Sequence, residues 1–163
     1  MTVNAVGKVG IEVKRAYLAG LIDGDGCIMA TIEHNPEMKF GFRVRVELKI
    51  TQKEDHILQE LAQEFKIGRV SCNRADSSFA TYDWIIRDKD DLKTILESIE
   101  PYTRSKKKQV EIALEILQNS IKSEEDLKKN ALLADALSKL NVRSEGRRKN
   151  FATMIQIPIS SND

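Results

Sequence analysis

The chain has 163 residues, which is enough for one domain with a sizeable core and leaves little room for a second. Apolar residues make up 41% and charged residues 31%, which excludes a disordered or fibrous protein. The net charge of +1 taken alone argues against a nucleic-acid partner, and the lack of a long apolar run argues against a membrane span. We expect an intracellular protein, in the cytoplasm or in an organelle such as a chloroplast or mitochondrion. Two cysteines, Cys27 and Cys72, are too few for a disulfide framework and are expected to be buried and reduced.

The first part of the chain predicts a helix, a β-hairpin and a second helix. Helical spacing of apolar residues stops at Gly24 and Gly26, whereas strict alternation predicts two strands joined by an Asn-Pro turn at residues 34–37. In chain order the expected elements are a mobile arm over 1–11, a helix over 12–23, strands over 28–33 and 42–50, and a helix that starts at a capping box, Thr51 to Glu54, and ends at Gly68.

The second part predicts a further hairpin and three helices. In chain order we expect strands over 69–74 and 81–87, a helix between an Asp88 cap and Pro101, helices over 105–119 and 123–140 with Ser123 as a cap, and a basic loop followed by an apolar tail over 141–163. Short strands joined by hairpins predict an α+β fold, with a four-stranded antiparallel sheet and helices on one of its faces. Residues 1–163 are interpreted as a single domain.

The segment from Leu18 to Gly26 is the most informative stretch of the chain. Ala16 and Gly20 lie four residues apart, so they share a helix face that is flat enough for a second helix to approach closely. Asp25 follows the helix end between two glycines, where a carboxylate and nearby carbonyls could hold a hard cation. Taken alone, a Gly-Asp-Gly sequence favours a helix C-cap with a tight turn over a metal site.

The nine residues Leu18-Ala19-Gly20-Leu21-Ile22-Asp23-Gly24-Asp25-Gly26 resemble the signature of the LAGLIDADG homing endonucleases almost letter for letter. The predicted order of elements is also similar to that family's α-β-β-α-β-β-α core and saddle-shaped sheet. The chain holds one signature, because the nearest second candidate, at residues 133–137, lacks the Gly-Asp-Gly end. The resemblance therefore implies a homodimer, the form of the single-motif members, with Ala16, Ala19, Gly20 and Asp23 at the interface.

The same resemblance implies the catalytic groups. Asp25 would be the metal ligand contributed by each subunit, with the carbonyl of Gly24 as an additional ligand, whereas Asp23 would serve the helix end and not the metal. Gln52 would orient the active-site water, and Lys106 would be the basic residue near the cleavage site. From the residues alone, Gln52 could be an exposed first-turn residue, and Lys106 could be a solvated helix start. Positive charge is unfavourable at a helix N-terminus, which favours a functional reason for Lys106.

The activity implied is that of an intron-encoded homing enzyme. It would hydrolyse double-stranded DNA at a long pseudo-palindromic target and leave 3′ overhangs. The cofactor implied is Mg²⁺, for which Mn²⁺ could substitute, whereas Ca²⁺ would bind without cleavage. Neither a membrane nor a small-molecule substrate is expected.

The sheet would lie in the major groove of the DNA, where arginine suits guanine, asparagine suits adenine and acidic groups suit cytosine. A solvated sheet face would have the same mixed charge. The outward positions expected to read bases are Met29, Thr31, Glu33, Asn35, Arg43, Arg45, Glu47, Lys49, Arg69, Ser71, Asn73, Thr81 and Asp83. Four further cations, Arg143, Arg147, Arg148 and Lys149, are candidate phosphate contacts.

Two other functions remain open from the sequence. One is an RNA maturase that assists intron splicing, and the other is a DNA-binding regulator that does not cleave. The presence of Asp25 argues against the regulator. Acidic residues concentrate in 54–100, on helices expected to face away from DNA, so the total charge understates how basic the binding face is.

Overall fold

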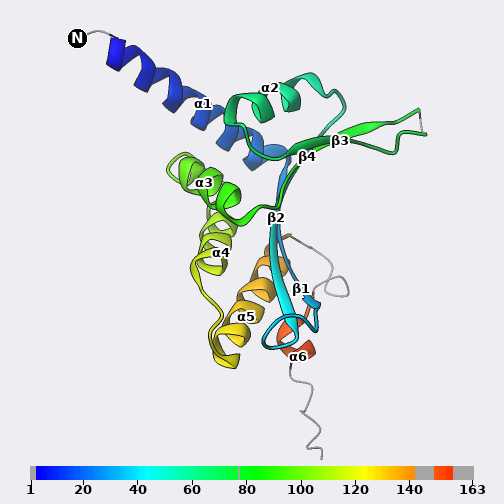
Figure 1. Cartoon of the computed structure of the whole chain (residues 1–163). Coiled ribbons are helices and arrows are strands. Elements are labelled where there is room, and N and C mark those ends of the chain that lie inside the picture. Colours follow the sequence, from blue (N-terminus) through cyan, green and yellow to red (C-terminus); the bar gives the residue numbers. More distant parts are fainter. Residues whose placement is uncertain (1–2, 77, 142–148, 156–163) are drawn as a thin grey trace, which may run out of the picture.

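A computed structural model of the chain describes residues 3–76, 78–141 and 149–155. It confirms the α+β class and the predicted order of the elements, with one short helix added near the C-terminus (Figure 1). The elements are α1 (Val3–Asp25), β1 (Gly26–His34), β2 (Phe42–Gln52), α2 (His56–Phe65), β3 (Arg69–Asn73), β4 (Thr81–Ile86), α3 (Lys89–Ile99), α4 (Lys107–Gln118), α5 (Glu124–Asn141) and α6 (Phe151–Met154).

The described strands form one antiparallel sheet in the order β1-β2-β4-β3. Every second residue is buried from Gly26 to Ile32 in β1 and from Val46 to Ile50 in β2, as the sequence alternation predicts. The buried residues pack against the helices, which lie on one side of the sheet (Figure 1). The opposite face, here called the open face, carries the polar residues of the four strands and is not covered by any of the described helices.

The core beneath the sheet is built around Trp84, which is 1% exposed. Its indole Nε1 donates a hydrogen bond to the carbonyl of Ile67 at 2.9 Å, so its polar atom is satisfied. The neighbouring Gly68 has φ +74, and a Cβ there would lie 2.6 Å from Trp84 Nε1. A glycine is therefore required both by the backbone conformation and by the space next to the indole.

The predicted capping box from Thr51 to Glu54 is wrong. Thr51 and Gln52 are the last residues of β2, opposite Asp83 and Tyr82 of β4, and α2 begins only at His56. The Thr51 hydroxyl donates to Asp83 and does not cap a helix. Pairing with β4 prolongs the strand past the point where local sequence favours a helix start.

Two other predicted caps are confirmed. The Asp88 carboxylate accepts hydrogen bonds from the N–H groups of Asp90 and Asp91 at the start of α3. Before α5, the Ser123 hydroxyl accepts from the Asp126 N–H, and the Asp126 carboxylate accepts from the Ser123 N–H. This reciprocal pair is a capping box, which fixes where α5 begins.

The expected mobile arm over 1–11 is wrong from Val3 onward, because α1 begins there. Its first turns extend beyond the rest of the molecule (Figure 1).

Near the C-terminus, Phe151 of the predicted apolar tail is 7% exposed and packs into the core. The Asp135 carboxylate accepts a hydrogen bond from the Phe151 N–H at 2.6 Å and so holds this residue in place. In the described part of the chain, no helix is long and apolar enough to cross a bilayer.

Candidate active site and nucleic-acid interface

The end of α1 turns directly into β1. A Cβ at Gly26 would lie 2.7 Å from the carbonyl oxygen of Ile22, so only glycine permits this close approach of strand to helix. The turn leaves Asp25 exposed, and Gln52 Nε2 donates to Asp25 Oδ2 at 2.7 Å. The structure thus brings together two residues predicted for the active site, from the ends of α1 and β2 (Asp25 and Gln52).

Asp23 has a different role from Asp25, two residues away. Its carboxylate accepts from the backbone N–H of Arg104 at 2.8 Å and of Lys106 at 3.0 Å. The carboxylate therefore holds the turn that precedes α4, which agrees with the expectation that Asp23 serves the helix end. Burial raises the pKa of Asp23, but the hydrogen bonds from these backbone groups lower it by more, so the net pKa lies below the ordinary 3.8.

Lys106 is half-buried at the same end of α1. Its Nζ donates to the backbone carbonyl of Asp23 at 2.6 Å, one of the carbonyls that the end of a helix leaves unpaired. The interpretation of Lys106 as a solvated helix start is therefore wrong. The ammonium group of Lys106 lies at the negative end of α1, where the helix dipole favours a cation.

The lowered pKa of Asp23 predicts a pH-dependent contribution to stability. A carboxylate whose pKa is lower in the folded state stabilises the fold above the unfolded pKa and loses this effect as pH falls through the folded value. We expect Asp23→Asn to lower the free energy of unfolding by about 1–3 kcal/mol at pH 7. Urea denaturation from pH 7 down to pH 3 should show the deficit shrinking below roughly pH 5, and a deficit that stayed constant would contradict the assignment.

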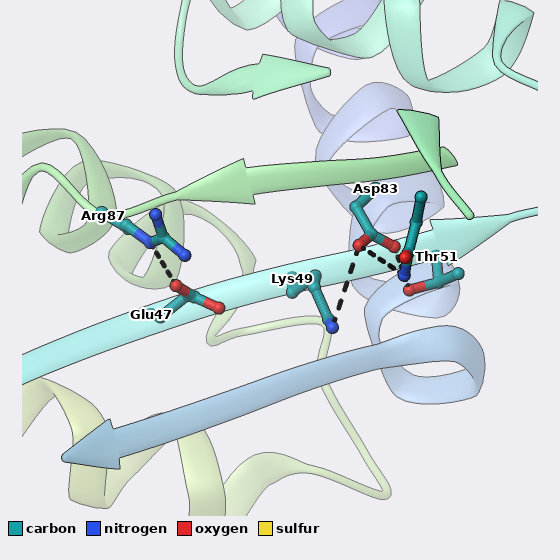
Figure 2. Close-up of polar contacts among 6 residues, drawn as sticks. Glu47, Lys49, Thr51, Asp83 and Arg87 are labelled. Atoms are coloured by element: carbon teal, nitrogen blue, oxygen red, sulfur yellow. Dashed lines mark hydrogen bonds and ion pairs between the residues drawn. The ribbon is translucent and has the colours of Figure 1, made fainter. Parts of the chain in front are cut away.

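The open face carries the predicted base-reading residues, and three of them are acidic: Glu33, Glu47 and Asp83. Each is paired with a cation. Arg45 Nη2 lies 3.6 Å from Glu33 Oε2, Lys49 Nζ lies 3.9 Å from Asp83 Oδ2, and Arg87 Nε donates to Glu47. Figure 2 shows the last two pairs on the neighbouring strands β2 and β4.

Glu47 and Asp83, which were expected to accept from cytosine, thus each have a cationic partner within the chain. Asp83 is only 6% exposed and accepts from Thr51 Oγ1 at 2.6 Å. The sequence analysis also missed Arg87, which follows β4 and pairs with Glu47. Extending the alternation of Thr81 and Asp83 by two more steps would have placed Arg87 on this face.

The remaining outward residues stand where alternation predicts them. Arg43, Arg69 and Asn73 are exposed, whereas the others are half-buried (Met29, Thr31, Ser71 and Thr81). Asn35 lies in the hairpin turn, where its side-chain oxygen accepts from the N–H of Glu37 at 3.0 Å. Of the four predicted phosphate contacts, Lys149 is exposed, and Arg143, Arg147 and Arg148 lie outside the described residues.

A cavity of about 750 Å³ opens beside β2, beyond the point where β4 ends. Four cationic side chains line it, together with polar groups from the end of α4 and from α5: Arg43, Arg45, Arg87, Lys89, Asn119, Ser120 and Asn130. Among its lining residues Asp88 alone is acidic, and its carboxylate caps α3. The open face is therefore continuous with a positively charged recess.

The two cysteines differ in exposure. Cys27, on the open face, is half-buried, and burial raises the pKa of its thiol despite the nearby charges of Lys49 and Lys106. Cys72 on β3 is exposed, so the expectation of a buried thiol is wrong there. Both are free cysteines, as expected.

One side of α1 is apolar and exposed. Val13 is 62% and Tyr17 53% exposed, and Ala16 and Gly20 lie on the same surface. A Cβ at Gly20 would meet nothing within 4 Å in the described chain. Ala19, in contrast, is 0% exposed and belongs to the core of its own chain. Its predicted place at an interface between copies is therefore wrong, because a third of a helical turn separates it from Gly20.

Known proteins share this arrangement. Residues 18–116 match the family model of the LAGLIDADG endonucleases, over more than half of the chain. This chain belongs to the LAGLIDADG endonuclease family. The match covers both hairpins and the segment that supplies the three catalytic candidates, Asp25, Gln52 and Lys106.

Two curated LAGLIDADG relatives come from green algae. DNA endonuclease I-CreI of Chlamydomonas reinhardtii is 33% identical over 104 residues, which are 63% of this chain and 61% of that protein, so the match spans less than two thirds of its length. DNA endonuclease I-CvuI of Chlorella vulgaris is 29% identical over 144 residues, which are 86% of this chain and 85% of that protein. The crystal structure of I-CvuI with its target and calcium superimposes with a TM-score of 0.79 at 28% identity, covering 90% of this chain and 92% of that chain.

Proposed function

We propose that the chain is a site-specific endonuclease that hydrolyses double-stranded DNA as a homodimer. The observation that carries this proposal is the contact between the exposed Asp25 and Gln52, at the end of the signature helix and at the edge of an open sheet face. The relatives named above are DNA endonucleases, and I-CvuI was crystallised with its DNA target. We further propose that it acts inside the cell on a DNA substrate, in the cytoplasm or in a chloroplast or mitochondrion.

Asp25 fits the needs of a divalent metal such as Mg²⁺. Mg²⁺ prefers hard oxygen ligands and is usually held by one or two carboxylates, with water and substrate oxygens in the other positions. Asp25 is exposed. Gln52 donates a hydrogen bond to Asp25 Oδ2, whereas Asp25 Oδ1 has no partner among the described residues. Asp25 would hold the metal with the carbonyl of Gly24, and the bound metal would supply an activated water and stabilise the charge that develops on the phosphate.

The other residues of the site would orient the reactants. Gln52 fixes one oxygen of Asp25 and has an amide oxygen left to accept from a water. Lys106 adds a positive charge at the end of α1, where it would attract the DNA backbone. Asp23 holds Lys106 in place through the turn before α4. One chain supplies one such set, whereas cleavage of both strands needs two.

The exposed side of α1 would supply the contact between two copies. An apolar helix surface with Ala16 and Gly20 at its centre lets a second α1 approach closely, and Val13 and Tyr17 would be buried on each side. A two-fold axis along this contact would place two Asp25 carboxylates near each other. The two open faces would then extend in opposite directions along a pseudo-palindromic DNA target.

A cleavage selection tests this function. The purified chain is incubated with a randomised, two-fold-symmetric double-stranded DNA library in Mg²⁺, with Ca²⁺ in place of Mg²⁺ as the control. We expect one family of related sites to be cut in both strands with 3′ overhangs in Mg²⁺, and bound without cleavage in Ca²⁺. Binding of the library without cleavage in Mg²⁺ or Mn²⁺ would favour the non-cleaving regulator, and binding of intron RNA alone would favour the maturase.

A further inference from the structure

The open face contains a buried carboxylate that connects three strands. Asp83 of β4 lies opposite Thr51 of β2 on one side and opposite Ser71 of β3 on the other. Its Oδ1 accepts from Thr51 Oγ1 at 2.6 Å, and its Oδ2 accepts from Asn73 Nδ2 at 3.3 Å. Lys49 Nζ lies 3.9 Å from the same Oδ2, so both oxygens of Asp83 are engaged (Figure 2).

Asp83 is too deeply placed and too well paired to read bases itself. At 6% exposure its carboxylate has little contact with water, and the charge is tolerated because hydroxyl, amide and ammonium donors surround it. Moving an oxygen to a cytosine amino group would leave one of these donors without an acceptor. The three partners are more accessible than Asp83: Lys49 and Thr51 are half-buried, and Asn73 is exposed.

The carboxylate fixes which way the Asn73 amide faces. An ionised carboxylate only accepts hydrogen bonds, so the NH₂ group of Asn73 and not its oxygen must lie toward Asp83. The second N–H and the side-chain oxygen then remain for another partner, side by side. That pair of one donor and one acceptor matches the N7 and N6 edge of adenine in the major groove.

The same oxygen restrains Lys49. A free lysine side chain has many rotamers, and the ion pair with Asp83 limits the positions of its ammonium group while leaving further N–H donors available. Lysine suits the O6 and N7 acceptors of guanine. Two side chains of different base preference, from β2 and β3, are therefore oriented by one carboxylate on the strand between them.

We propose that Asp83 is a positioning residue that sets base specificity through Asn73 and Lys49 without touching DNA. This proposal rests on the proposed DNA-binding function. It predicts that the base pairs affected by changing Asp83 are the same as those affected by changing Asn73 or Lys49. A residue with a merely structural role would lower affinity for all sequences alike.

The test is a binding selection from a randomised double-stranded DNA library in Ca²⁺, with the full chain and four single variants: Asp83→Asn, Asn73→Ala, Lys49→Met and Glu33→Gln. We expect Asp83→Asn to reduce discrimination roughly fivefold or more at the base pairs that Asn73→Ala and Lys49→Met define. Glu33→Gln is the matched control, because it removes a paired carboxylate at the far end of the β1–β2 hairpin. It should change discrimination only at other base pairs.

A combined variant separates positioning from direct contact. In the Asn73→Ala, Lys49→Met double variant, adding Asp83→Asn should change base preference no further, because the side chains it orients are gone. A further change of base preference in this triple variant would mean that Asp83 contacts DNA, which would overturn the proposal. An unchanged base preference in Asp83→Asn alone would also overturn it. If Asp83→Asn does not fold in thermal denaturation, Thr51→Val removes the donor to Oδ1 and should shift the same base pairs. Failure of the unmodified chain to select any DNA would refute the proposed function instead.

Discussion

Replacing Asp25 with Asn is expected to abolish DNA cleavage while DNA binding and folding persist. Asn keeps the shape of the side chain and can still accept the hydrogen bond from Gln52, but it lacks the negative charge that a divalent metal needs. Loss of the metal's contribution of several kcal/mol corresponds to a fall in cleavage rate of at least about 10³-fold. Single-turnover cleavage in Mg²⁺, together with DNA binding in Ca²⁺, measures the two effects separately.

Asp23→Asn is the matched control for this variant. It changes the same residue type two positions away, but the Asp23 carboxylate accepts from backbone N–H groups at the start of α4. We expect Asp23→Asn to lower the free energy of unfolding and Asp25→Asn to leave it nearly unchanged, since Asp25 is exposed. Full cleavage activity of Asp25→Asn would refute its assignment as a metal ligand.

Gly20→Leu is expected to separate the copies of the chain without harming the fold. A Cβ at Gly20 would meet no atom of the described chain within 4 Å and the residue is exposed, so we expect the single chain to accommodate leucine. Leucine also favours a helix over glycine by roughly 0.8 kcal/mol. The same side chain would prevent two α1 helices from approaching closely, so the variant should be monomeric and lose double-strand cleavage.

Sedimentation velocity and thermal denaturation of the same samples test this prediction, with Gly20→Ala as the control. Alanine adds one methyl group, improves helix propensity similarly and should leave a dimer. A Gly20→Leu variant that sediments as a dimer and cuts both strands would place the contact between copies elsewhere than on α1. A monomer that still makes double-strand breaks would show that two copies are not needed.

The sequence predicts the sheet well because its signal is local. Strict alternation from Phe42 to Ile50 can be read without knowing what the strand packs against, and the Asp88 cap is set by the residues just after it. The start of α2 is harder. Thr51 to Glu54 has a valid capping pattern, and only the partner strand β4, thirty residues later, shows that Thr51 belongs to β2.

The candidate site was predictable as a set of residues but not as a set of contacts. The signature identifies Asp25, yet nothing near it in the sequence indicates that Asp23 bonds to residues 104–106. The charges of the open face are equally ambiguous in sequence. Alternation places Glu47 and Asp83 on that face, but their cations come from neighbouring strands, and the pairs depend on the register between β2 and β4.

The Asp23 contact also has a consequence for the order in which the chain folds. Both β-hairpins join neighbouring segments, whereas the bond from the Arg104 N–H to Asp23 connects residues 81 positions apart. Contacts that close long loops form late, because the entropy of loop closure must be lost before they contribute. The chain is therefore expected to complete the hairpins of the open face before Lys106 joins the end of α1. A chain arrested before that step would have the polar sheet face without the Lys106 contact at the candidate active site.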